Sequence, residues 1–107
     1  MPKFLTIGYG DREGYERTPK ALREAAHAQD EKLKKSGFLV GIAGTPVQVR
    51  NHEAKHLVTE RGPYIKTQLP VAGFAVIEAP NMEEAIKMTA QVPCAIAYGV
   101  VEIWPFE

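Results

Sequence analysis

The segment from Arg61 to Pro105 constrains the fold more than any other part of the chain. It contains a Gly-Pro-aromatic loop, an apolar strand predicted over 72–79, a helix, and a closing strand predicted over 100–104. A strand–helix–strand unit this short has to pack its helix across a sheet. We therefore expect a sheet with helices on it, although no motif in this segment identifies a substrate.

The helix of this unit has recognisable ends. Asn81 is a good N-cap, and Glu84 follows three residues later, which is the spacing of a capping box. Met82, Ala85, Ile86 and Thr89 are expected to face the sheet. Because proline cannot continue a helix, we expect this one to end at Pro93.

The first part of the chain repeats the same order of elements. An apolar strand is predicted over Phe4–Tyr9, followed by a charged loop over 11–17. Thr18 then resembles an N-cap with Pro19 at the first helical position, where its missing N–H costs nothing. The helix is expected to end just before Gly37, a residue typical of helix C-termini.

Two strand–helix–strand halves are joined by a hairpin. The apolar run 38–44 predicts a second strand, buried on both faces because its hydrophobicity is nearly continuous. Valines alternate with polar residues over 47–50, and 56–59 returns after a turn at Asn51. The prediction is one α+β domain over 1–107: a ferredoxin-like split βαβ fold with an antiparallel sheet and an extra β-hairpin.

A sheet with both helices on one side leaves its other face bare. That face is expected to carry some of Phe4, Phe74, Val76 and Trp104. So large an exposed apolar surface is unusual for a monomer. We therefore expect a homodimer in which two such sheets pack face to face.

The composition limits the partners. Thirteen basic residues balance thirteen acidic ones, so no net field favours direct nucleic-acid binding or an anionic membrane. No apolar run approaches the roughly 20 residues of a membrane span, and the N-terminus lacks the apolar run of a signal peptide. The single Cys94 cannot form an internal disulfide and has apolar neighbours. It is expected to be a packed thiol in a cytoplasmic protein.

His27 is the main candidate for acid–base chemistry because an imidazole titrates near neutral pH. Asp30 lies three residues later and could orient the ring from the same helix. A second interpretation competes with this one. Arg23, His27, Asp30 and Lys34 share one helical face of mixed charge, away from the apolar stripe, and such a face is usually solvated. The pattern leaves both interpretations open.

Candidate ligand-binding residues lie elsewhere in the chain. Arg50 and Arg61 flank the hairpin and could grip a carboxylate or phosphate, with Tyr64 nearby. Tyr9 and Tyr15 could line the mouth of a pocket at the end of the first strand. His52 and His56 straddle the hairpin turn and have no third ligand nearby, so no metal is expected. Because no phosphate-binding loop or dinucleotide fingerprint is present, no cofactor is expected either.

The order of several short motifs resembles the YCII-related family, and more closely its DGPF-type branch. The matching segments are Leu57-Val58-Thr59, Gly62-Pro63-Tyr64, Gly73-Phe74, Glu84-Ala85-Ile86 and Val101-Glu102-Ile103. The resemblance is strong over 37–107 and weaker over 10–30. It implies a dimeric α+β barrel.

The chain departs from that family at two functional positions. Arg61 stands where the DGPF-type loop carries Asp, and Val92 stands where YCII proteins have an Asp before the proline of the last turn. His27 falls roughly at the family's helix histidine. DGPF-type proteins are often associated with alternative sigma factors, which implies a sensing or accessory role. The sequence slightly favours such a non-catalytic module binding a small, perhaps anionic, ligand; the alternative is a small isomerase- or lyase-type enzyme using His27.

Overall fold

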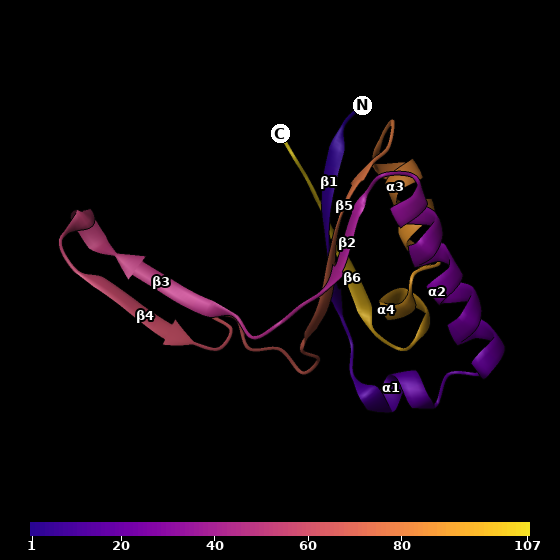
Figure 1. Cartoon of the computed structure of the whole chain (residues 1–107), viewed down its shortest axis with the longest axis horizontal. Coiled ribbons are helices and arrows are strands. Elements are labelled where there is room, and N and C mark those ends of the chain that lie inside the picture. Colours follow the sequence, from indigo (N-terminus) through magenta and orange to yellow (C-terminus); the bar gives the residue numbers. More distant parts are fainter.

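The computed structural model describes all residues from Met1 to Glu107 and contains six strands, four α-helices and one 3-10 turn (Figure 1). In chain order, the elements are β1 (Lys3–Tyr9), α1 (Arg12–Glu16), α2 (Lys20–Lys35), β2 (Leu39–Ile42), β3 (Val47–Asn51), η1 (His52–Ala54), β4 (Leu57–Arg61), β5 (Val71–Glu78), α3 (Met82–Thr89), α4 (Pro93–Ile96) and β6 (Val100–Pro105).

Four of the six strands form one antiparallel sheet in the order β2-β5-β1-β6. The helices lie on one side of this sheet, and its other side is uncovered (Figure 1). This arrangement confirms the predicted ferredoxin-like α+β fold. We call the sheet with its helices the body of the molecule.

The core of the body lies between the sheet and the helices. Ile77 is completely buried and is paired across strands with Phe4, and both pack against Leu33 of α2 and Ala85 of α3. Alternate residues of each strand point to this side, as the period of two requires. Phe4 was one of the residues considered for the bare face, and that placement was wrong because its register puts it on the helix side.

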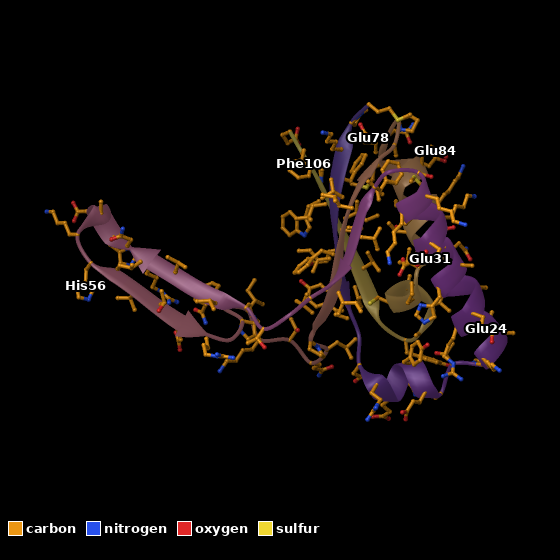
Figure 2. All side chains as sticks on the ribbon, viewed as in Figure 1. Glu24, Glu31, His56, Glu78, Glu84 and Phe106 are labelled. Carbon is orange, nitrogen blue, oxygen red and sulfur yellow. The ribbon has the colours of Figure 1, made fainter.

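The opposite side of the sheet, which we call the open face, carries large apolar side chains in solvent. Leu5 pairs with Val76 and Trp104, so these three side chains form one row across the sheet. Trp104 is 55% exposed and Phe74 is 46% exposed. Figure 2 shows side chains projecting from this face toward the side on which the hairpin lies.

β2 differs from its prediction. It is an edge strand that pairs only with β5, and Leu39 and Ile42 are 73% and 94% exposed. The predicted burial on both faces was therefore wrong. Continuous hydrophobicity indicates a strand without a polar face, but it does not say whether a neighbouring strand or helix covers it.

The region before the long helix is also more ordered than predicted. Residues 12–16 form α1 instead of a loop, because the Asp11 side chain caps the helix by accepting a hydrogen bond from the Gly14 N–H at 2.9 Å. Thr18 is not an N-cap of α2. Its hydroxyl donates to the Gly14 carbonyl at 2.8 Å, and Pro19 occupies the N-cap position without a side-chain bond.

The predicted end of the second helix needs a similar correction. Asn81 caps α3 by accepting from the Glu84 N–H at 2.9 Å, as expected, but α3 ends at Thr89. Pro93 begins the short helix α4 instead of ending α3. The cause is the dual character of proline, which breaks a helix interior and suits a first helical turn.

The hairpin of β3 and β4 forms a separate two-stranded sheet that extends away from the body (Figure 1). We call it the arm. The hairpin was predicted, but its turn was not: the left-handed backbone is adopted by Glu53 and Ala54 at the arm tip, and not by Asn51.

Candidate functional site

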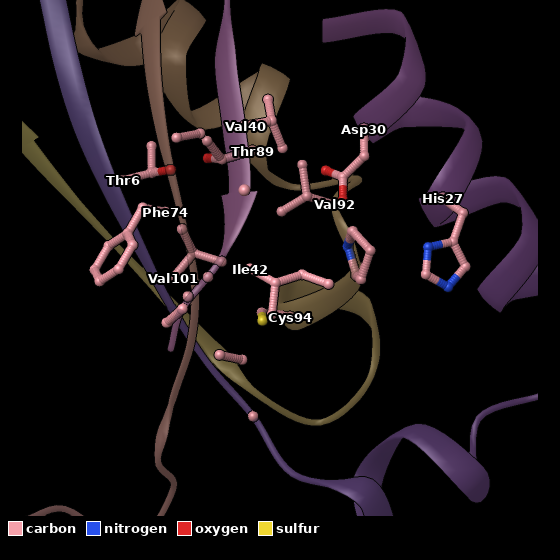
Figure 3. Close-up of a pocket in the computed structure, with 18 of the residues that line it drawn as sticks. Thr6, His27, Asp30, Val40, Ile42, Phe74, Thr89, Val92, Cys94 and Val101 are labelled. Carbon is pink, nitrogen blue, oxygen red and sulfur yellow. The ribbon is translucent and has the colours of Figure 1, made fainter. Parts of the chain in front are cut away.

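A cavity of about 870 Å³ lies between the helix side of the sheet and helices α2 and α4 (Figure 3). Its lining is largely apolar and includes Val40, Ile77, Val92 and Val101. Such a lining with a few polar groups is typical of a small-molecule site. The polar groups that reach the cavity come mainly from α1 and α2.

Glycines line the sheet side of the cavity and have no side chains to fill it. Gly8 of β1 pairs with Gly73 of β5, so two adjacent strands lack side chains at the same level. A Cβ on Gly8 would lie 2.8 Å from the Cys94 sulfur. The thiol of α4 therefore packs directly against the backbone of β1, which fixes the wall of the cavity.

His27 lines the cavity from α2 and contacts Tyr15 of α1. The Tyr15 hydroxyl and His27 Nε2 are 2.8 Å apart, within hydrogen-bond distance, and the two rings meet edge to face with centroids 5.7 Å apart. The Arg23 guanidinium lies 5.0 Å from the centre of the Tyr15 ring, on the same helix as His27. These contacts hold the imidazole in one orientation.

Asp30 lies one turn further along α2 and is directed toward the sheet, beside Val92 (Figure 3). Burial in the cavity raises the pKa of its carboxyl group, and the nearby His27 and Lys34 partly oppose this shift. Asp30 and Val92 line the same cavity, and Val92 stands at the position before Pro93 at which YCII proteins were expected to carry their carboxylate. This chain places an acid in that neighbourhood from the helix instead.

The helical face that carries His27 is thus neither fully solvated nor fully enclosed. His27 is exposed by area but lines the cavity, and Asp30 is half-buried. Lys34 also lines the cavity and is exposed; it pairs with Glu31 at 3.4 Å. The sequence could not decide between a solvated face and a ligand-binding face, because the cavity wall opposite α2 comes from β1, β5 and α4, which are distant from α2 or from one another in the chain.

Cys94 lines the same cavity, and its apolar neighbours in sequence did not reveal this. Burial, and to a smaller extent the negative charge of Asp30, raises the pKa of its thiol. A thiol with a raised pKa is mostly protonated at neutral pH and is a poor nucleophile. Its position against Gly8 agrees with the predicted packed thiol.

The other predicted ligand-binding residues lie outside the cavity. Tyr9 is on the open face, where its hydroxyl donates to the Glu102 carboxylate at 2.5 Å; this bond raises the pKa of Tyr9. Arg50 is on the arm, 3.7 Å from Glu60 and with its guanidinium 5.8 Å from the Tyr64 ring centre. Arg61 ends β4 of the arm. The structure brings His27 and Asp30 together and places the arginine candidates elsewhere.

Cations at the cavity are paired. Arg12 contacts Glu16 at 3.4 Å and Lys34 contacts Glu31 at the same distance. No group of three or more His, Cys, Asp or Glu side chains is arranged to hold a metal ion. None of the helices is both long enough and apolar enough to cross a membrane.

Together, the ferredoxin-like body and the cavity beneath α2 define a small α+β domain with a largely apolar pocket whose wall includes His27 and Asp30. The model of the YCII-related domain matches residues 3–107, nearly the whole chain. The protein therefore belongs to the YCII-related family. No curated protein matches the chain.

Proposed function

We propose that this protein is a small proton-transfer enzyme that acts on a largely apolar substrate in the cavity. The observation that carries the proposal is the 2.8 Å contact between Tyr15 and His27 at the cavity wall, with Asp30 one helical turn away. A general base needs a suitable pKa, a fixed orientation and access to a bound substrate. His27 lines the cavity, which gives it access to a bound substrate, and its contact with Tyr15 orients the ring.

The three side chains have different roles in this proposal. His27 takes a proton from a substrate C–H group on Nδ1 and returns it, as in an isomerisation or elimination, while its Nε2–H donates to the Tyr15 hydroxyl. Asp30 stabilises the imidazolium that forms, because its carboxylate lines the same cavity and interacts electrostatically with His27. Tyr15 is a positioning residue that holds the ring through Nε2.

The lining indicates the kind of substrate. Most of the cavity surface is apolar, and its two cations are already paired with glutamates. These features favour a small, neutral, largely apolar carbonyl compound over the anionic ligand suggested by Arg50 and Arg61. A carbonyl group acidifies the adjacent C–H bond, which is what the weak base His27 requires.

Deuterium incorporation tests this proposal without knowledge of the product. A panel of small aldehydes, ketones and keto acids is incubated with the protein in D₂O, and exchange at carbon is followed by proton NMR. We expect exchange with the wild type and a loss of about 10²–10⁴-fold in His27→Ala, the range for general acid–base groups. His56→Ala at the arm tip is the matched control and should retain full exchange. Tyr15→Phe should lose less, about 10-fold.

A second candidate is the non-catalytic sensing or accessory module, which the apolar lining also supports. The same experiment separates the two. A compound that shifts amide resonances of cavity residues equally in wild type and His27→Ala, without deuterium exchange in either, identifies a binding module. Exchange that persists unchanged in His27→Ala refutes the proposed role of this residue.

The proposed working unit is a homodimer with the two open faces packed together, the dimeric α+β barrel arrangement. The support is the apolar row on the open face, with Trp104 and Leu39 more than half exposed. Light scattering after gel filtration tests this. Trp104→Asp should give a monomer, whereas Leu22→Asp, an equally exposed apolar residue on α2, should leave the dimer intact. A wild-type protein that is monomeric at all concentrations excludes the homodimer.

A further inference from the structure

The chain has far more surface than a compact protein of its mass. Its solvent-accessible area is 7846 Å², whereas a compact monomer of 11.8 kDa has about 5,900 Å². Its radius of gyration is 15.6 Å against about 13 Å for a compact chain of this length. The excess area of about 1,900 Å² is more than the roughly 800 Å² per partner that a stable interface buries.

The arm is the part of the chain that departs from a compact shape. β3 and β4 bond only to each other and project from the same side of the body as the open face (Figure 1). A lone two-stranded hairpin is at best marginally stable in water. The arm tip adds to this problem, because Glu53 and Ala54 adopt left-handed backbone angles that cost energy in residues other than glycine.

The two faces of the arm differ. Val47 and Val49 of β3 point to one face, and Leu57 of β4 joins them because it is paired with Asn51 two residues further along. These three side chains are 57%, 66% and 67% exposed. Asn51, Thr59 and Arg61 share this face with them. The opposite face carries Gln48, Arg50 and Glu60, which bond to one another or to the backbone, and a single apolar residue, Val58. The face of Val47, Val49 and Leu57 is therefore the more apolar of the two, and nothing in the chain covers these three side chains.

We propose that the arm clasps a second copy of this chain, with the face formed by Val47, Val49 and Leu57 lying against the body of the partner. The argument rests on the proposed homodimer. In a two-fold dimer each copy supplies both an open face and an arm on the same side, so each arm extends along the other body. A second copy has an identical apolar row, which can pack against the open face of the first. It also has the same excess surface area to bury.

The arm tip supplies a direct test. His56 marks the tip in Figure 2, and the neighbouring Lys55 is the lysine of the arm, where it follows the 3-10 turn η1. An amine-reactive cross-linker is added to the intact protein, mixed from ordinary and ¹⁵N-labelled chains. We expect mixed-label cross-links between Lys55 of one copy and body lysines of the other, such as Lys3, Lys20 or Lys87. Lys55→Arg keeps the charge and should remove them.

The outcomes separate this inference from the dimer on which it rests. Mixed-label links between bodies with none to Lys55 overturn the clasp and leave the dimer standing. A protein that forms no mixed-label links at all, and is monomeric by light scattering, removes both. Links from one arm tip to the other arm alone also overturn the proposal, because they place the arms against each other.

A matched pair of variants gives an independent test. Val49→Asp adds a charge to the apolar face of the arm and should raise the dimer dissociation constant at least 10-fold. Gln48→Glu, the adjacent residue on the opposite face, should change it less than 2-fold. Far-ultraviolet circular dichroism verifies that the body remains folded in both. Equal dissociation constants for Val49→Asp and the wild type refute the clasp.

Discussion

The body and the arm are built from the same alternating strand pattern, yet they differ in what that pattern buries. In the body, alternate residues of β1 and β5 place Phe4 and Ile77 under the helices, where they are 4% and 0% exposed. In the arm, the same alternation leaves Val47 and Val49 more than half exposed. Alternation therefore fixes which side chains point the same way. Whether they are covered depends on a second layer, which α2 and α3 provide only for the body.

This difference predicts where the stability of a single chain resides. Ile77→Ala removes a fully buried side chain and should lower the free energy of unfolding by about 2–5 kcal/mol. Val49→Ala, measured at protein concentrations low enough to avoid association, should change it by less than about 0.5 kcal/mol. Chemical denaturation followed by circular dichroism measures both. Similar losses for the two variants would show that the arm is packed within one chain.

The cavity wall supplies the next largest effect. In Gly8→Ala the new Cβ would meet the Cys94 sulfur at 2.8 Å, so overpacking should cost about 1–3 kcal/mol. Gly44→Ala, next to the arm, meets nothing within 4 Å and should be nearly neutral. The double variant Gly8→Ala/Cys94→Ala should recover part of the loss in thermal unfolding. Failure to recover any of it would place the strain in the β1 backbone and not at the sulfur.

Ionisation of Asp30 in the cavity wall should destabilise the folded protein. Because burial raises the pKa of its carboxyl group, the folded protein binds this proton more readily than the unfolded chain. Stability therefore falls as the pH rises from the ordinary carboxyl pKa of about 3.9 through the raised value, and stays lower above it. We expect Asp30→Asn to melt at a higher temperature than the wild type at pH 7.

The pH dependence provides the control for this expectation. Below the ordinary carboxyl pKa, Asp30 is protonated in both states, so the advantage of Asp30→Asn should vanish there. Melting curves recorded across the acidic range measure this change. An advantage of the same size at every pH would assign it to packing and not to ionisation.

The smallest expected effect concerns chemical reactivity and not stability. The raised pKa of the Cys94 thiol leaves little thiolate at neutral pH. Alkylation by iodoacetamide, followed by mass spectrometry, should be several-fold slower in the folded protein than in the denatured chain at the same pH. A cysteine introduced on the arm in a Cys94→Ala background, for example Glu60→Cys on the face opposite Val49, should react at the rate of the denatured chain. Equal rates for Cys94 in the two states would contradict the raised pKa.

The sequence predicted the elements of the body well because their ends and periods are local properties. The Asn81 cap and the order of strands and helices along the chain follow from local sequence patterns. Whether a strand lies at the edge or in the centre of a sheet is not a local property. β2 was expected to be buried, and it is exposed because no strand lies beyond it. α1 was missed because the Asp11 cap and its Gly14 partner enclose a single charged turn without an apolar period.

The site was only partly accessible from the sequence for the same reason. His27 and Asp30 are three residues apart on one helix, so their proximity follows from helical spacing. The contact of His27 with Tyr15 joins two helices, and the presence of Cys94 in the same cavity depends on the packing of α4 against β1. No spacing in the chain encodes either contact. The ligand-binding roles of Tyr9, Arg50, Arg61 and Tyr64 remain predictions.

The order of strands in the sheet has a consequence for how the chain folds. β1 is the first strand to be made, and its two neighbours, β5 and β6, both lie in the last 37 residues. Its pairings, such as Phe4 with Ile77 and Leu5 with Trp104, therefore close very long loops. Such non-local contacts slow folding, because the entropy of loop closure is lost before the contacts form. During synthesis the first strand has to wait for nearly the whole of this sequence before it is paired on both sides.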